Sequence, residues 1–205
     1  MTKPKIAIIY YSTYGTNHAV ASEAARAAEA AGAEVRLRRV PETAPKDVVA
    51  GQEAWQAHLD ATANIPEISH DDMAWADGYF FAAPTRFGSM PSQLRAFIDT
   101  LGGLWFTGEL ANKTVTATTS AQNAHGGQES TLLAFYTSLM HWGTIVVTPG
   151  YTDAVVSEAG GNPYGFSATN GVFDDKGRAA VAHQARRLVQ VTAKLAQQAE
   201  TAAAA

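Results

Sequence analysis

Short runs of apolar residues alternate with longer stretches of helical pattern along this chain. The runs KIAIIYY (5–11) and GYFFAA (78–83) are almost continuously apolar, which is typical of strands buried on both faces of a parallel sheet. AEVRLRRV (33–40) alternates apolar and polar residues, as a strand at the edge of a sheet does. Together with NKTVTATTS (112–120) and TIVVTP (144–149), the pattern predicts five strands.

Helical patterns lie between these strands. Residues 18–32 are rich in strong helix formers and close with Gly32, a residue suited to a helix C-terminus. Residues 91–103 and 127–143 each place apolar side chains on one face. The last predicted helix does the same with Val181, Ala185, Leu188 and Leu195. Strands that alternate with helices, without an internal repeat, predict an α/β fold with a doubly wound parallel sheet and helices on both faces.

Two stretches depart from the alternation. Residues 41–76 contain prolines, charges and only weak helical patches, although Ser69 with Asp72 is placed to cap a short helix over residues 71–76. Residues 149–176 are rich in glycine and proline and read as a loop. We expect one domain over residues 1–205, with these two long excursions on its surface.

Composition narrows the class of protein. The 205 residues are 46% hydrophobic, and the net charge of −4 provides no basic surface for direct binding to nucleic acid or acidic lipid. The absence of cysteine excludes disulfides, zinc–thiolate sites, iron–sulfur clusters and thiol catalysis. The N-terminus lacks the features of a signal peptide, and no apolar run approaches the roughly 18 residues that span a bilayer. We expect a cytoplasmic globular protein that does not bind membranes.

The ends of the predicted strands carry the candidate chemistry. If the strands take the flavodoxin-like order 2-1-3-4-5, the ligand crevice lies beyond the carboxyl ends of the first, third and fourth strands. Those ends carry STYGTN (12–17), PTRFGS (84–89) and SAQNAHGG (120–127). Three polar loops that contain glycine therefore converge on one place, and this convergence is the strongest functional signal in the sequence.

Familiar motifs are missing from these loops. The patterns GxxxxGK[ST], GxGxxG, GxSxG and HExxH do not occur, and no acidic pair ends the first strand. Neither a nucleoside triphosphate, a Rossmann dinucleotide nor a magnesium-dependent phospho-acceptor is therefore indicated. The remaining histidines, His18, His58, His70 and His183, have no ligand-like spacing, so we predict no metal site.

The first loop suits a phosphate monoester. Hydroxyls of Ser12, Thr13 and Thr16, the amide of Asn17 and free N–H groups of a following helix can surround one phosphate without a cation, with Gly15 at the turn. A capped turn between strand and helix explains the same residues equally well when this loop is taken alone.

The other two loops favour a planar cofactor ring. Phe87, Tyr14 and Trp105 of the GGLW segment offer aromatic surface, and Gln122, Asn123 and His125 offer hydrogen bonds. Core packing is the alternative for Trp105, and a solvated surface charge is the alternative for Arg86. His141 lies near the end of an apolar helical face, where a buried core histidine is the default interpretation.

Several segments resemble one known family. YYSTYGTN, PTRFGSMPSQLRAFIDTLGGLW and SAQNAHGGQES, with PGYTD and GGNPYG further on, are similar to the tryptophan-repressor-binding-protein (WrbA) family of NAD(P)H:quinone oxidoreductases. Those proteins are flavodoxin-fold FMN enzymes and are typically homotetramers. The resemblance runs from residue 5 to the C-terminal helix. It implies FMN as the cofactor, held by Ser12, Thr13, Tyr14, Gly15, Thr16, Asn17, Pro84, Thr85, Arg86, Phe87, Gly88, Ser120, Ala121, Gln122, Asn123, Ala124, His125 and His141.

The resemblance also implies roles for individual residues. Residues 12–17 would hold the phosphate, and Thr85, Arg86 and Phe87 would line the isoalloxazine. Tyr14 matches the nicotinamide contact, Trp105 the quinone contact and His141 a histidine at the flavin. His141 and Tyr14 are accordingly the candidates for catalysis, as aids to quinone protonation. The third loop departs from the Thr/Gly-rich pattern of many members, and this leaves the flavin potential and the quinone preference open.

The implied reaction is a ping-pong transfer of two electrons from NAD(P)H through FMN to a small quinone, which leaves as hydroquinone. The sequence does not distinguish NADH from NADPH. Two alternatives stay open: a flavodoxin-like one-electron carrier, and a regulatory flavoprotein that binds a protein partner.

Overall fold

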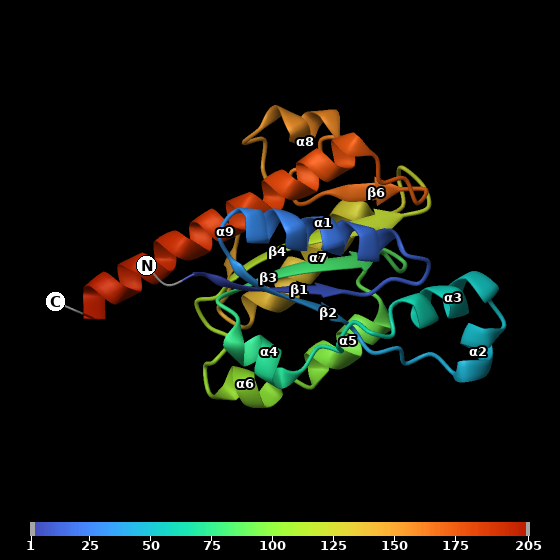
Figure 1. The fold of residues 1–205 in the computed structure, drawn as a ribbon, viewed down its shortest axis with the longest axis horizontal. Helices are drawn as coiled ribbons and strands as arrows, with labels where there is room; N and C mark the ends of the chain where they lie inside the picture. Colours follow the sequence, from blue (N-terminus) through green and yellow to red (C-terminus); the bar gives the residue numbers. More distant parts are fainter. Residues whose placement is uncertain (1–2, 204–205) are drawn as a thin grey trace.

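A parallel sheet in the order β2-β1-β3-β4-β5 forms the centre of the molecule (Figure 1). The computed structural model describes residues 3–203, with side chains as far as residue 198. Its strands are β1 (Lys5–Tyr10), β2 (Glu34–Arg39), β3 (Gly78–Pro84), β4 (Thr114–Ala121), β5 (Ile145–Val146) and β6 (Ser167–Thr169). The predicted doubly wound sheet and its strand order are confirmed.

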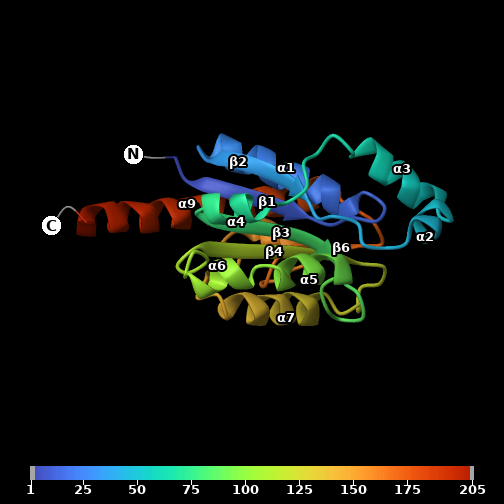
Figure 2. The same ribbon diagram turned by 90° about the horizontal axis from the view of Figure 1, so that it is seen from below.

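Helices cover both faces of this sheet (Figure 2). On one face, α1 (Thr16–Ala30) and α9 (Asp175–Ala203) bury Val20 and Val181 against Ile6, Ile8 and Phe80. On the other face, α4 (His70–Trp75), α5 (Ser92–Asp99), α6 (Gly102–Phe106) and α7 (Gln128–Met140) cover a second apolar cluster. Burial on both faces explains the uninterrupted apolar runs of β1 and β3.

The fifth predicted strand, over residues 144–149, is shorter in the structure, and a further short strand that the sequence pattern did not reveal follows it. β5 pairs only with Thr114 and Val115 at the start of β4, and the chain then leaves the sheet near Pro149, which has no N–H to donate. β6 pairs with the last residues of β4, so the sheet has six strands within residues 3–203. The prediction of an unbroken loop over residues 149–176 is therefore wrong, since β6 and α8 (Ala154–Glu158) lie within it.

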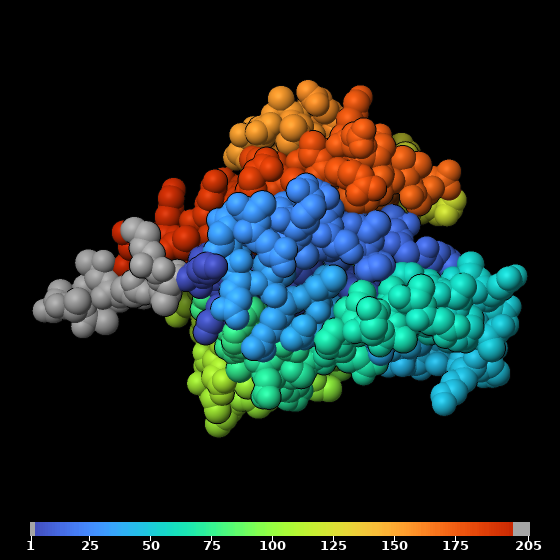
Figure 3. Space-filling model, in the orientation of Figure 1, coloured from blue at the N-terminus to red at the C-terminus, as the bar shows by residue number. Residues whose placement is uncertain are grey.

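The excursion over residues 41–76 contains three short helices. They are α2 (Lys46–Ala50), α3 (Glu53–Ala61) and α4, and Ser69 with Asp72 forms the predicted cap as a complete capping box. α2 and α3 form a small helical pair that stands beside the first loop (Figure 3). Residues 46–61, which lie outside the alternation of strands and helices, are therefore next to the first loop.

The strand register aligns the carboxyl ends at one edge. Tyr10 pairs with Ala82, Pro84 pairs with Ser120, and Ala121 pairs with Thr169. The loops that follow β1, β3, β4 and β6 therefore leave the sheet side by side. Within the described residues, no helix is long and apolar enough to cross a membrane.

Candidate cofactor-binding site

A cavity of about 580 Å³ opens at the carboxyl edge of the sheet. This volume lies within the roughly 300–1,000 Å³ typical of small-molecule sites. Its walls come from the three predicted loops and from one further segment after β6. The lining residues are Ser12, Thr13, Tyr14, Thr16, Asn17, Pro84, Thr85, Arg86, Phe87, Ser120, Ala121, Gln122, Asn123, Gly126, Asn170 and Gly171.

The first loop leaves the N-terminus of α1 open toward this cavity. Gly15 is the N-cap residue at φ 102°, a left-handed conformation that favours glycine, and no side chain caps the helix. The Gly15 N–H donates to Ser12 Oγ over 3.0 Å, which closes the turn. The first N–H groups of a helix have no partner within it. They are therefore available to an anion, as the sequence predicted for a phosphate.

Asn17 gives a further sign that the site is built for a ligand. The side chain is 2% exposed and lines the cavity, and its Nδ2 donates to Ser120 Oγ over 2.9 Å. Its Oδ1 has no hydrogen-bond partner. A buried acceptor without a partner is costly, so a ligand with hydroxyl donors would satisfy it. The ribityl chain and phosphate of FMN match this acceptor and the neighbouring N–H donors.

The second loop supplies charge and aromatic surface. Arg86 Nη2 donates to Thr13 Oγ1 over 2.8 Å, so the guanidinium joins the second loop to the first. Among the described residues that line the cavity, Arg86 is the one that carries a formal charge. Phe87 adopts φ 52° and its side chain is fully exposed. The local backbone thus holds an aromatic ring at the rim instead of burying it in the core.

The third loop is held by the segment after β6. Asn170 N–H donates to Ala121 O over 2.9 Å, and Gln122 Nε2 donates to Asn170 Oδ1. Gly126 lies so close to the loop that a Cβ there would be 2.5 Å from the Cβ of Ala121. Asn170 and Gly171 are lining residues that the sequence analysis missed. The Asn-Gly pair signals a turn, but its position beside the third loop depends on β6.

Most of the predicted cofactor residues line this one cavity. Gly15, Gly88, Ala124 and His125 belong to the same loops without forming its wall. Tyr14 lies at the rim with 61% of its surface exposed, and its hydroxyl donates to Gln52 Oε1 in the turn between α2 and α3.

Trp105 and His141 lie elsewhere. They line a second hollow of about 500 Å³ formed by α5, α6 and α7, which shares no lining residue with the first. Trp105 Nε1 donates to His141 O over 2.9 Å, and 53% of the Trp105 surface is exposed. Neither residue is buried in the core, and within one chain neither contacts the candidate cofactor cavity.

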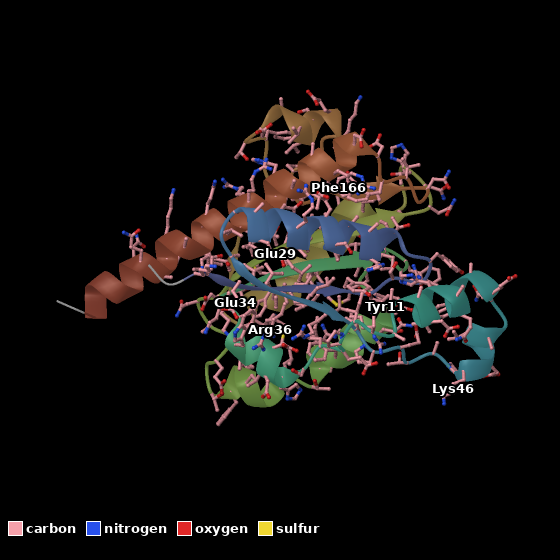
Figure 4. The ribbon with its side chains drawn as sticks, in the orientation of Figure 1. Tyr11, Glu29, Glu34, Arg36, Lys46 and Phe166 are labelled. Carbon is pink, nitrogen blue, oxygen red and sulfur yellow. The ribbon has the colours of Figure 1, made fainter. Side chains whose placement is uncertain are left out.

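Glu42 connects the first loop to two helices. Its carboxylate accepts hydrogen bonds from Tyr11 Oη at 2.9 Å, Trp55 Nε1 of α3 at 3.2 Å and Gln93 Nε2 of α5 at 2.7 Å. Figure 4 labels Tyr11 between the end of β1 and the α2–α3 pair. Burial raises the pKa of Glu42, but hydrogen bonds, with that from the Ala44 N–H first, outweigh burial and lower it.

The described residues contain no metal-binding cluster. Between residues 3 and 198, no three His, Cys, Asp or Glu side chains are grouped so that they could hold an ion. The described lining of the cofactor cavity consists of neutral residues and Arg86.

A doubly wound parallel sheet with an open helix N-terminus and a polar cavity at its carboxyl edge defines a flavodoxin-like protein. Residues 4–155 match the family of NADPH-dependent FMN reductases, and the chain belongs to this family. It is an oxidoreductase, and several of its relatives are named NAD(P)H dehydrogenase (quinone). A protein of Deinococcus radiodurans named NAD(P)H dehydrogenase (quinone) is 56% identical over 198 residues, covering 95% of this chain and 99% of the relative.

Other relatives agree with this assignment. A Geobacter sulfurreducens protein of the same name is 40% identical and covers 93% of this chain and 98% of its own length. A WrbA-like flavodoxin from Agrobacterium tumefaciens is 18% identical, with a TM-score of 0.62 and coverage of 94% and 99%. An oxidoreductase from Corynebacterium diphtheriae, also 18% identical, gives a TM-score of 0.63 with coverage of 95% and 99%. At this identity the solved structures show the flavodoxin-like fold.

Proposed function

We propose that this chain binds FMN in the 580 Å³ cavity and catalyses the two-electron reduction of quinones by NAD(P)H. The names of its relatives support the reaction, and the family supports the cofactor. The observation that carries the assignment is the uncapped N-terminus of α1 beside the buried, unpartnered Oδ1 of Asn17. The N–H groups can bind an anion, and the Asn17 oxygen can accept a hydrogen bond from a hydroxyl. FMN has both a phosphate and hydroxyl groups.

The loops would divide the cofactor between them. Residues 12–17 would hold the phosphate, Asn17 and Ser120 would bind the ribityl chain, and Phe87 and the third loop would line the place of the ring. When bound, FMN supplies the two-electron chemistry, by accepting a hydride from NAD(P)H and returning two electrons to the quinone. Arg86 contributes a fixed positive charge next to Thr13, where the cavity contains no acidic side chain to oppose it.

The two substrates would use one place in turn. Tyr14 and Phe87 are exposed side chains at the rim, and a nicotinamide or a quinone that packs against them excludes the other. This sharing supports a ping-pong sequence. The described lining of the cavity includes no carboxyl group, and Tyr14 and His141 are our candidates for delivering protons to the reduced quinone.

A second copy of the chain would bring Trp105 and His141 to the site. Both lie in a separate hollow, and the exposed side chains of Phe106 and Met140 lie on the helices that form it. A homotetramer in which these residues face a neighbouring cavity accounts for their exposure. We therefore propose the tetrameric assembly and the WrbA subgroup together.

Anaerobic flavin spectroscopy tests the proposal. The protein is loaded with FMN, mixed with NADH or NADPH, and then given benzoquinone while the flavin absorbance is followed. We expect rapid bleaching and complete recovery on addition of the quinone, and the two bleaching rates identify the preferred nucleotide. Bound FMN that neither nucleotide reduces would indicate an electron carrier, and failure to bind FMN would reject the site.

A further inference from the structure

The side chains of His18 and His58 lie near the first loop and outside the lining of the cofactor cavity. The ring of His18, in the first turn of α1, stacks on Tyr10 with centroids 5.1 Å apart. The ring of His58, from α3, lies 5.5 Å from that of His18. A methyl group placed on Gly15 would be 3.6 Å from His58 Nδ1. The imidazole of His58 therefore borders the residue that opens α1, although it comes from the excursion and not from any strand-end loop.

The surroundings favour the neutral form of both imidazoles. Burial lowers the pKa of His18. Burial also lowers the pKa of His58, and repulsion from His18 lowers it further. The adjacent helix N-terminus has the same tendency, since its dipole disfavours a nearby cation. An anion bound at the first loop would act in the opposite direction on both groups.

The charged and titratable neighbours leave this balance to the ligand. β1 contributes Tyr10, and Arg39 of β2 acts on the phenol of Tyr10. The first turn of α1 has no acidic residue. On α3, Asp60 accepts a hydrogen bond from Gln56, and Glu53 lies in the exposed first turn. In the part of the chain that the structure describes, neither imidazole forms an ion pair.

We propose that His18 and His58 form a proton-binding pair that strengthens the binding of a phosphate ester at the first loop, so that the dianion and a proton bind together. The first loop has no lysine, and the one formal charge among the described lining residues is that of Arg86, whose guanidinium reaches Thr13 from the second loop. The imidazoles would add a second positive charge from the side of Gly15 on which His58 lies. This inference rests on the proposed FMN site and names residues outside its lining that select the phosphate.

Linkage fixes the direction of the pH dependence. A bound dianion raises the affinity of the pair for a proton, and by reciprocity the proton raises the affinity for the dianion. The gain is present while the pair is protonated in the complex and is lost as the pH rises through its titration. The second ionisation of a phosphate ester, near pH 6, has the opposite effect, because the dianion forms as the pH rises. Phosphate binding should therefore weaken from about pH 6.5 upward.

Fluorescence titration of the full chain, freed of flavin, provides the test. Dissociation constants for FMN and for riboflavin, which lacks the phosphate, are measured from pH 6 to 8.5. We expect FMN affinity of the wild type to fall about fivefold over this range, and riboflavin affinity to stay constant. His58→Gln and, as a second variant, His18→Gln should lose most of this slope. The matched control is His70→Gln, at an exposed histidine of α4 that is hydrogen-bonded to Thr100, and it should retain the pH dependence of FMN affinity.

Proton uptake gives an independent readout. Calorimetric binding of FMN in two buffers of different ionisation enthalpy should show a fraction of a proton taken up by the wild type, and less by His58→Gln. Equal slopes and equal uptake in wild type and both variants would overturn the inference while leaving the FMN site intact. If neither FMN nor riboflavin binds, the proposed function fails and this inference fails with it.

Discussion

The cofactor cavity and the hollow around Trp105 and His141 are built in different ways. The cavity of about 580 Å³ draws its walls from four segments that follow β1, β3, β4 and β6, and it is closed by backbone turns and by cross-loop bonds such as Arg86 to Thr13. The hollow of about 500 Å³ around Trp105 and His141 is a surface feature of α5, α6 and α7. The first depends on the order of strands in the sheet, and the second depends on side chains that three helices leave exposed.

This difference separates two parts of a single reaction. A strand register that aligns Tyr10, Pro84 and Ala121 brings the three loops together in every copy of the chain. Nothing in that register brings α6 or the end of α7 to the same edge. A cofactor site can therefore be complete within one chain, whereas the proposed quinone site that includes Trp105 would need a second chain.

The largest expected effect tests whether the cofactor cavity depends on backbone geometry. Gly15→Val should weaken FMN binding roughly 30-fold or more, because a residue with a Cβ costs about 1–2 kcal/mol in this conformation and a β-branched one costs more. Relief of that strain would turn the N–H groups of the loop away from the phosphate. Flavin fluorescence quenching measures the affinity.

Gly32→Val is the matched control for this change. Gly32 also has a positive φ, of 94°, but it follows α1 at the far end, and no atom lies within 4 Å of the position that a Cβ would take there. It should lower stability and leave FMN affinity unchanged. Equal losses of FMN affinity in both variants would show that backbone strain anywhere in α1 weakens binding, and that the conformation of the first loop is not the specific cause.

The next effect concerns the second hollow. Trp105→Ala should lower kcat/KM for benzoquinone about tenfold, the equivalent of roughly 1.4 kcal/mol of lost aromatic contact, with no change in FMN affinity. Trp105→Phe should restore most of the activity, because it keeps the aromatic surface. Tyr151→Ala, at an exposed aromatic side chain that lines neither the cofactor cavity nor the hollow, is the control. A loss of FMN affinity in Trp105→Ala would contradict the separation of the two regions.

The sequence pattern was sufficient for most of the sheet. β1 and β3 are buried on both faces and read as unbroken apolar runs, and β2 at an edge alternates apolar and polar residues. β5 was predicted too long, and β6 was missed because three residues are too few to show a pattern. The lengths of both strands are determined by their pairing with the two ends of β4, which is a tertiary property.

The candidate site shows the same limit. Loops 12–17, 84–89 and 120–127 were predictable because a doubly wound sheet fixes where strand ends meet. Asn170 and Gly171 were missed because they follow β6, and Gln52 and His58 because they lie in an excursion whose position no periodicity reports. Residues that reach a site from irregular segments are invisible until the fold places them.

A smaller effect tests the missed segment. Asn170→Gly should weaken FMN binding about threefold, since glycine adopts the φ of 51° freely and only the bond from Gln122 is lost, worth about 0.5–1.5 kcal/mol. Asn112→Gly, at another asparagine of positive φ and outside the cofactor cavity, is the control. Unchanged FMN affinity in Asn170→Gly would show that the third loop keeps its shape without this support. Titration with flavin measures both variants.

The last effect concerns Glu42. Its carboxylate accepts hydrogen bonds from Tyr11, just before the first loop, and from Gln93 of α5, a helix beside the second hollow. Its pKa in the folded protein lies below the ordinary value of 4.5, so its carboxylate stabilises the fold above about pH 4.5 and loses that contribution as the pH falls through the lowered pKa. Glu42→Gln should reduce the free energy of unfolding by about 1 kcal/mol at pH 7. The gap between wild type and variant should close toward pH 3.

Urea denaturation at a series of pH values measures this gap. Glu34→Gln, at the exposed first residue of β2, is the control and should lower the free energy of unfolding less than Glu42→Gln does at pH 7. A constant gap between wild type and Glu42→Gln would mean that the carboxylate acts by packing alone. If Glu42→Gln also leaves FMN affinity and quinone turnover unchanged, the two hollows are independent despite the bond that joins them. A change in both FMN affinity and quinone turnover would show that the Glu42 carboxylate positions Tyr11 and α5 together. The first loop and the helix that borders Trp105 would then depend on the same hydrogen bonds.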